Sequence, residues 1–336
     1  MRRIAIETLT GQVRDVFVRH RTSPQNASIM AENCVGAERD GASSHGLFRL
    51  RGYVDSLESG WVDGFAEPAL ETAGEEAGTI RVDARNGFAQ PALRKAFGPA
   101  VDMARKRGVC LVTIRDSHHF GALWPDVEPF ARCGLVALCF VNSMTRMVPW
   151  GGHTPVYGTN PMAFAAPRPS GDPVVFDQAS SAMAFGDIKL AAASGEPLPE
   201  GCAVDRDGLP TTDAAAVVAG GALLPFGGHK GSSIAMMVEL LCAGLTGGSF
   251  SFEVDQSGFP GAQTPRTGET LVLIDPERVG QRRFAERAEQ LFSRLGAAGQ
   301  ERLPGDRRYA KRRQAEREGI PVDNDMLASL KALAVE

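Results

Sequence analysis

Hydrophobic residues near the start of the chain recur with the period of a helix. A first helix is predicted over residues 4–20, where the apolar positions are Ile6, Leu9, Val13, Val16 and Phe17. A second is predicted to begin at Ser23-Pro24, which supplies a cap and a proline at the first helical position. A third is expected to end at Gly60. Residues 40–49 fall in the turn between the second and third helices.

Longer apolar runs in the middle of the chain are typical of buried strands. Residues 109–114 and 135–141 form two such runs, and a loop and a short helix over 124–131 separate them. This strand–loop–helix–strand order favours an α/β fold with a mixed, largely parallel sheet. Further strands are predicted over 79–82, 162–166, 174–176 and 271–274, and further helices over 88–107, 177–193, 233–245, 280–296, 307–317 and 323–334.

Composition and charge limit the classes of function. The 336 residues are 43% hydrophobic and 23% charged, as in ordinary globular proteins, and the net charge of −4 gives no indication of nucleic-acid binding. No apolar run approaches the roughly 20 residues that span a bilayer, and no apolar segment of a signal peptide follows the basic start. The six cysteines form no C-x-x-C pair, which is typical of reduced thiols in a cytoplasmic protein.

The stretch 40–49 concentrates chemically active side chains. His45 follows Ser44, and an imidazole beside a hydroxyl is a candidate proton donor. Arg49 lies four residues further on, where its planar fork could hold a carboxylate. The same residues also suit a helix cap followed by a solvated arginine. Of the six histidines, only His20 lies outside a glycine-rich or polar stretch, and we expect it at the surface.

Familiar nucleotide and metal motifs are missing. No G-x-G-x-x-G follows a strand, no P-loop is present, and without an H-E-x-x-H motif we expect no metal site. Three loops that precede predicted helices could instead bind an anion through backbone amides, at residues 117–122, 177–181 and 226–233. Arg307 and Arg308 could hold a cofactor phosphate, or could belong to a solvated helix face.

Four motifs together resemble the malate/L-lactate dehydrogenase type 2 family of NAD(P)H oxidoreductases. They are Asp40-Gly-Ala-Ser-Ser-His-Gly, Gly158-Thr-Asn-Pro, Gly186-Asp-Ile-Lys and Gly227-Gly-His-Lys-Gly, and the similarity extends from about residue 4 to 330. The resemblance implies a non-Rossmann NAD(P)-binding fold flanked by helical parts. It divides the chain into a helical part, 1–75, that packs with 276–336, a sheet domain, 76–160, and a cofactor-binding domain, 161–275.

The resemblance also implies roles for individual residues. His45 would donate the proton, with Ser44 and Asp187 as relay partners, while Arg49 and Thr159 would bind the substrate. The cofactor would contact His119, Phe120, Gly121, Ala122, Leu123, Asp177, Gln178, Ala179, His229, Lys230, Arg307 and Arg308. A homodimer is expected, with neither a nucleic-acid nor a membrane partner.

Within the family, residues 117–130, 225–241 and 248–255 are most similar to reductases of Δ1-piperideine-2-carboxylate and Δ1-pyrroline-2-carboxylate. This similarity implies NADPH-dependent reduction of a cyclic imine 2-carboxylate to L-pipecolate or L-proline, with NADH as a possible replacement. Two alternatives stay open at this point. The same His45 and Arg49 would serve a dehydrogenase of 2-hydroxy acids such as malate or lactate, and the fold could also carry a ligand-binding protein without catalysis.

Overall fold

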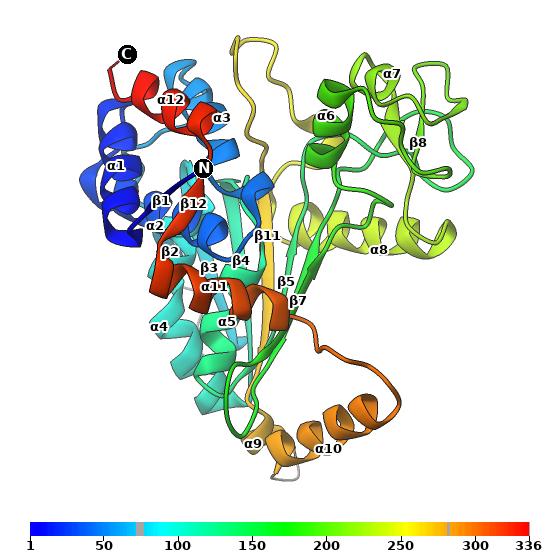
Figure 1. The fold of residues 1–336 in the computed structure, drawn as a ribbon. Helices are drawn as coiled ribbons and strands as arrows, with labels where there is room; N and C mark the ends of the chain where they lie inside the picture. Colours follow the sequence, from blue (N-terminus) through cyan, green and yellow to red (C-terminus); the bar gives the residue numbers. More distant parts are fainter. Residues whose placement is uncertain (72–76, 281–282, 336) are drawn as a thin grey trace.

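A seven-stranded mixed sheet forms the centre of the molecule (Figure 1). The computed structural model describes residues 1–71, 77–280 and 283–335. The spatial order of the strands is β2 (Ala69–Glu71), β3 (Thr79–Phe88), β4 (Val109–His118), β11 (Arg266–Ile274), β5 (Val136–Val141), β6 (Met162–Ala166) and β7 (Val174–Gln178). Strand β11, from late in the chain, therefore lies between two strands from the first half.

The prediction of a largely parallel sheet is wrong. Among the strands that the structure describes, only β3 and β4 pair in parallel, and the other five pairings of this sheet are antiparallel. The strand–loop–helix–strand unit around α5 (Trp124–Arg132) does exist, but β11 separates β4 from β5 and runs antiparallel to both. A local pattern predicts the unit and cannot reveal a strand inserted from residues 266–274.

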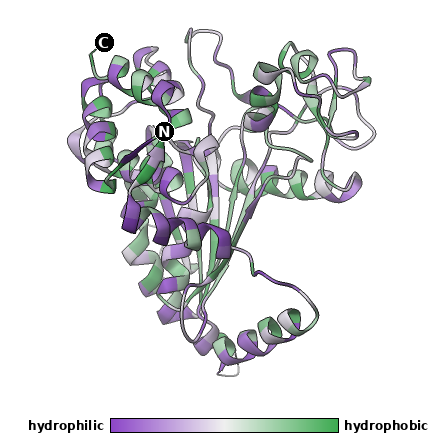
Figure 2. Ribbon diagram, viewed as in Figure 1, coloured by the Kyte–Doolittle hydropathy of each residue, from purple (hydrophilic) through white to green (hydrophobic). Residues whose placement is uncertain are grey.

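Alternating side chains place the two faces of the sheet against different helices. On one face, Ala137 and Cys139 of β5 belong to the hydrophobic cluster that includes α4 (Ala89–Arg107) and α5. On the other, Leu138 and Phe140 pack against α8 (His229–Glu239) and the π-helical turn that continues it, Leu240–Gly244. In Figure 2 the strands are largely green, which marks hydrophobic residues. Helix α11 (Asp306–Glu318) is largely purple, which marks hydrophilic residues.

The amino-terminal helices form a second hydrophobic cluster with the end of the chain. They are α1 (Ile6–Arg19), α2 (Pro24–Arg39) and α3 (Leu50–Glu58). The Ser23 side chain accepts from the amide of Asn26, so the predicted cap of α2 is confirmed. Helix α12 (Asn324–Leu333) contributes Leu330 and Leu333, and β1 (Arg2–Ile4) pairs with β12 (Ile320–Val322). The division of the chain into three domains stays a prediction.

A small lobe with its own hydrophobic cluster lies beyond the β6–β7 end of the sheet (Figure 1). It contains α6 (Phe185–Ser194), β8 (Ala203–Val204), β9 (Pro210–Thr211), α7 (Ala214–Val218) and β10 (Ala222–Leu223). Helix α6 begins eight residues later than predicted, because residues 177 and 178 still belong to β7. The region after β11 continues through α9 (Pro276–Val279) and α10 (Phe284–Ala297) to α11.

Candidate active site

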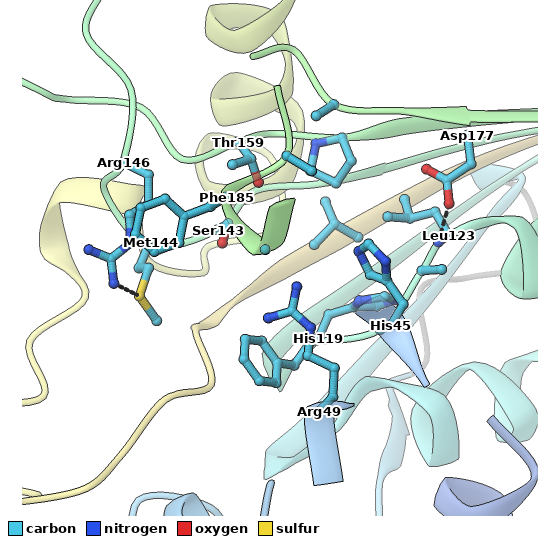
Figure 3. Close-up of a pocket in the computed structure, with 18 of the residues that line it drawn as sticks. His45, Arg49, His119, Leu123, Ser143, Met144, Arg146, Thr159, Asp177 and Phe185 are labelled. Atoms are coloured by element: carbon cyan, nitrogen blue, oxygen red, sulfur yellow. Dashed lines mark hydrogen bonds between the residues drawn. The ribbon is translucent and has the colours of Figure 1, made fainter. Parts of the chain in front are cut away.

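A cavity of about 550 Å³ lies between the sheet, the amino-terminal turn and the small lobe. One wall is the turn between α2 and α3, which contains two short 3-10 helices, η1 (Ser43–His45) and η2 (Leu47–Arg49). The loop after β4 forms the floor, and the loop between β5 and β6, the end of β7 with the loop that follows it, and the start of α6 form the opposite wall. Figure 3 shows His45, Arg49, Thr159 and Asp177 around this space.

The turn that carries His45 is held by Glu38 of α2. Its carboxylate accepts from the Ser43 hydroxyl at 2.6 Å and from the Leu47 amide at 3.0 Å. A Cβ at Gly46 would lie 2.3 Å from the Glu38 carboxylate, so this close approach requires glycine. The turn is not a simple helix cap, because it directs His45 and Arg49, on either side of Gly46, to the cavity.

Ser44, His45 and Arg49 are brought together as predicted. Ser44 Oγ and His45 Nδ1 lie 3.1 Å apart, and Arg49 Nε donates to the Ser44 carbonyl oxygen at 2.9 Å. The guanidinium carbon of Arg49 lies 4.2 Å from the centre of the Phe120 ring, so the charged group stacks on an aromatic face. These contacts fix Arg49 and leave its terminal nitrogens beside the cavity, where they could bind a carboxylate.

The surroundings of His45 favour its neutral imidazole. Burial lowers the pKa of its imidazole to about 4, and the positive charges of Arg49 and His119 act in the same direction. A bound anion would offset these charges and favour the imidazolium.

Asp187 lies in the first turn of α6, beside Arg49. Its side chain is exposed, and within the described ranges it makes no hydrogen bond to Ser44 or His45. The proton relay through Asp187 therefore stays a prediction, since Asp187 does not contact Ser44 or His45 in the described ranges. Gly186 comes closer to the amino-terminal turn, because a Cβ there would lie 3.7 Å from the Arg49 guanidinium and 3.8 Å from Ser44.

Asp177 orders the loop that carries the predicted cofactor contacts. One of its carboxylate oxygens accepts from the amides of Leu123 and Trp124, at 2.8 and 3.2 Å, at the start of α5. Burial raises the pKa of this carboxyl, and those two hydrogen bonds oppose the rise. The loop residues predicted to contact a cofactor do line the cavity: His119, Phe120, Gly121, Ala122, Leu123, Asp177, Gln178, Ala179 and, on the substrate side, Thr159.

The remaining predicted cofactor residues divide into two groups. Arg308 lines the main cavity and also a neighbouring cavity of about 520 Å³, formed by residues 299–305 with Arg307. It donates to the Val175 carbonyl oxygen at 2.8 Å and lies over the Trp124 ring. His229 and Lys230 are exposed at the start of α8 and do not line the main cavity.

Sequence reasoning missed two cations on the small-lobe side of the cavity. Arg146 lies 4.6 Å from the centre of the Phe185 ring, and the Lys189 ammonium approaches the same ring at 5.6 Å. Burial lowers the pKa of Arg146, and its guanidinium donates to the Met144 sulfur at 3.3 Å. The motif Gly186-Asp-Ile-Lys189 was a signal for the lysine, whereas Arg146 lies in a loop with no motif.

Two other histidines have structural partners. His118 is fully buried between the Thr264 hydroxyl at 3.0 Å and the Asn86 side-chain oxygen at 2.9 Å. The expectation that His20 lies at the surface is wrong. Only 5% of it is exposed, and it contacts Glu58 and the carbonyl oxygen of Leu333, because the end of the chain covers it.

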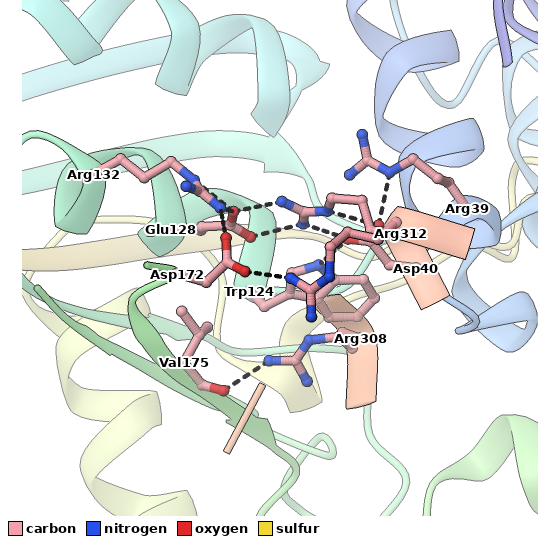
Figure 4. Close-up of polar contacts among 10 residues, drawn as sticks. Arg39, Asp40, Trp124, Glu128, Arg132, Asp172, Val175, Arg308 and Arg312 are labelled. Carbon is pink, nitrogen blue, oxygen red and sulfur yellow. Dashed lines mark hydrogen bonds and ion pairs between the residues drawn. The ribbon is translucent and has the colours of Figure 1, made fainter. Parts of the chain in front are cut away.

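Asp40, the acid at the start of the stretch 40–49, does not line the cavity and instead contacts Arg39 and Arg312 (Figure 4). Its carboxylate binds Arg312 of α11 at 2.5 and 3.0 Å and Arg39 at 2.7 Å. Arg312 also binds Glu128 of α5 at 2.6 and 2.8 Å. This ion cluster ties α11 to α2 and α5, so Asp40 anchors the turn that carries His45.

The fold and the cavity define an α/β protein whose main cavity is lined by several cationic side chains. The model of the family described as malate/L-lactate dehydrogenase matches residues 4–331, and the chain belongs to this family. It is 56% identical to a Delta(1)-pyrroline-2-carboxylate/Delta(1)-piperideine-2-carboxylate reductase of Pseudomonas syringae pv. tomato, over 98% of this chain and 96% of the relative.

Two further comparisons extend this result. A (2R)-3-sulfolactate dehydrogenase (NADP(+)) of Chromohalobacter salexigens is 43% identical, over 92% of this chain and 91% of the relative. The crystal structure of a delta1-piperideine-2-carboxylate reductase from Pseudomonas syringae pvar. tomato superimposes with a TM-score of 0.97 at 56% identity, covering 99% of this chain and all of that one. In the part that the structure describes, no helix has both the length and the hydrophobicity to cross a membrane.

Proposed function

We propose that this protein is an NADPH-dependent reductase of cyclic imine 2-carboxylates, acting on Δ1-piperideine-2-carboxylate and Δ1-pyrroline-2-carboxylate. The observation that carries the proposal is the placement of a neutral imidazole and a stacked guanidinium on one wall of a cation-lined cavity. The 56% identity to a reductase of these two compounds supports the choice of substrate.

The cavity fits a nicotinamide cofactor. Loop 119–123 and Ala179 offer backbone groups and small side chains along one side, and the two cavities meet at Arg308, whose charge would suit a phosphate. The missing G-x-G-x-x-G motif and the mostly antiparallel sheet support non-Rossmann binding. The choice of NADPH over NADH rests on Arg307 and Arg308.

The residues of this chain would orient the substrate and supply the proton. Arg49 would hold the 2-carboxylate and so fix the position of C2. The carboxylate would offset the charge near His45, which would then carry a proton toward the imine nitrogen, with Ser44 orienting the ring. The cofactor, when bound, supplies the hydride that C2 receives. Asp187 acts in this proposal through its charge beside Arg49.

A second candidate is reduction of a 2-oxo acid that carries another anionic group. Arg146 favours it, since this half-buried guanidinium has no carboxylate partner among the described residues and lies near Lys189. The sulfolactate dehydrogenase relative is named for such a dianion. Arg49 would again bind the 2-carboxylate, and His45 would donate the proton to the oxygen of the reduced carbonyl group.

We also infer a cytoplasmic homodimer. All six cysteines are free, which suits a reducing compartment. Met236 and Leu240 lie one turn apart on α8 and its continuation and are 50% and 56% exposed, so they present an apolar face that a second copy could cover. Sedimentation of the purified chain at micromolar concentration would test the dimer.

The proposed activity is tested with purified wild-type protein and its His45→Asn variant. NADPH oxidation is followed with each of the two imines, and cofactor binding is followed by fluorescence. We expect turnover by the wild type, a fall in kcat of about 100-fold or more in the variant, and unchanged cofactor binding. His153→Asn is the matched control, because His153 is exposed in a loop outside the cavity lining. Absence of turnover by the wild type with both imines would contradict the proposal, and unchanged turnover in His45→Asn would contradict the role of His45.

A further inference from the structure

A buried group of two carboxyls and one imidazole lies beneath the cavity floor. His119 Nε2 and Asp126 Oδ2 are 2.9 Å apart, with 3% and 4% of the side chains exposed. Glu269 of β11 is fully buried, and its carboxylate lies within 4.8 Å of the other two groups. Its Oε1 accepts from the Cys139 thiol, and its Oε2 has no partner among the described residues. Three titratable groups thus share one buried site.

Charge balance limits how many protons this group can hold. An unpaired buried charge is costly, whereas a hydrogen-bonded pair of opposite charges costs less. The arrangement with the least uncompensated charge has His119 as imidazolium, Asp126 as carboxylate and Glu269 as neutral acid. The pKa values agree with this arrangement: burial opposes the charge of His119, but Asp126 outweighs it and raises the pKa to about 9. Burial, followed by repulsion from Asp126, raises the pKa of Glu269 to about 8.

The imidazole of His119 faces the reaction space. It lines the same cavity as His45, and Figure 3 shows the two rings at the junction of the floor and the amino-terminal wall. Its positive charge is one of the influences that keep His45 neutral. Among the described residues, the other charged side chains that line this cavity are Arg49 of η2, Arg146 of the loop after β5, Asp177 of β7, Lys189 of α6 and Arg308 of α11.

We propose that Asp126 is a positioning residue, which holds His119 as a fixed imidazolium so that His45 accepts a proton only after an anionic substrate has entered. The positive charge attracts the 2-carboxylate and suppresses the imidazolium of His45 in the empty cavity. Once bound, the carboxylate compensates for the surrounding cations and His45 gains its proton. This gating rests on the proposed function, whereas the protonation of His119 does not.

The experiment titrates the histidines of the full-length protein by ¹⁵N NMR, with Glu269→Gln and Asp126→Asn/Glu269→Gln as variants. Glu269→Gln replaces a neutral acid by a neutral amide, so His119 should remain doubly protonated from pH 5 to 8, as in the wild type. The double variant removes both possible counter-charges with little change of shape. His119 should then be neutral at pH 7, and the titration midpoint of His45 should rise by about one pH unit.

The gating is tested with picolinate, an unreactive ring 2-carboxylate. In the wild type, saturating picolinate should raise the midpoint of His45 by at least one pH unit, and the double variant should bind picolinate several-fold more weakly. In the reductase assay, the double variant should show a raised KM for the imine and a displaced pH profile, which a purely structural role would not produce.

Three results would count against the account in different ways. A neutral His119 in the wild type at pH 7, or an unchanged midpoint of His45 in the double variant, would overturn the role of Asp126. Binding of picolinate without a shift of His45 would overturn the gating. Failure of picolinate to bind would contradict the carboxylate site at Arg49, and so the proposed function, while the ligand-free titrations would still decide the state of His119.

Discussion

Arg312→Met is expected to destabilise the protein by leaving two buried carboxylates short of a counter-charge. Only 1% of the Asp40 side chain and 7% of the Glu128 side chain are exposed, and Arg312 binds both. Removal of one partner of a buried ion pair typically costs about 3–5 kcal/mol. Asp40 keeps Arg39, and Glu128 keeps Arg132, so we expect a loss at the lower end, about 3 kcal/mol of unfolding free energy.

Urea unfolding of the wild type, Asp40→Asn, Arg312→Met and the double variant would measure this loss as a cycle. The double variant should cost less than the sum of the single variants, by about 1–3 kcal/mol, because it leaves no unpaired charge at position 40. Since Asp40 anchors the turn that carries His45, the folded Arg312→Met protein should also lose activity. An unfolding free energy within 1 kcal/mol of the wild type, or strictly additive variants, would refute the reasoning.

Four further predictions follow from the geometry. The Arg312 and Arg39 side chains outweigh burial and lower the pKa of Asp40, so the stability that Asp40 adds is present above its unfolded pKa and lost as the pH falls below about 4; the gap between wild type and Asp40→Asn in acid unfolding should close there. Asp177→Ala removes the acceptor for the amides at the start of α5 and should lower the unfolding free energy by about 1–2 kcal/mol in urea titrations. Arg49→Met removes a charge-assisted contact with the 2-carboxylate and should raise the KM of the imine by about 10- to 100-fold, with a small effect on NADPH binding. Arg308→Ala should weaken NADPH more than NADH in fluorescence titrations, and equal weakening would contradict a phosphate contact.

Local patterns predicted the elements of this fold better than their arrangement. The cap at Ser23, the strand at residues 162–166 and the helix before Gly60 depend on neighbouring residues and are confirmed. The position of β11 between β4 and β5 depends on pairing across more than 120 residues, for which the sequence carries no local signal. The prediction that His20 is exposed failed for the same reason, because the residues that bury it come from the end of the chain.

The candidate site divides in the same way. Ser44, His45 and Arg49 lie within one turn, so their proximity follows from sequence spacing, and loop 119–123 follows a recognisable strand. Contacts between distant segments could not be predicted from the sequence. The link between Asp40 and α11, and the approach of Glu269 to His119, require the folded chain. Long-range electrostatics, which sets the pKa of His45, could not be inferred from spacing alone.

The central claim is that the cavity reduces a cyclic imine 2-carboxylate in preference to a 2-oxo acid. The most direct test is the ratio of kcat/KM for Δ1-piperideine-2-carboxylate to kcat/KM for 3-sulfopyruvate, oxaloacetate and pyruvate, each measured with saturating NADPH. The account predicts that the imine exceeds every oxo acid by about 100-fold or more, a difference of about 2.7 kcal/mol in transition-state binding. A larger kcat/KM for any of the oxo acids would contradict it and would favour the dehydrogenase alternative.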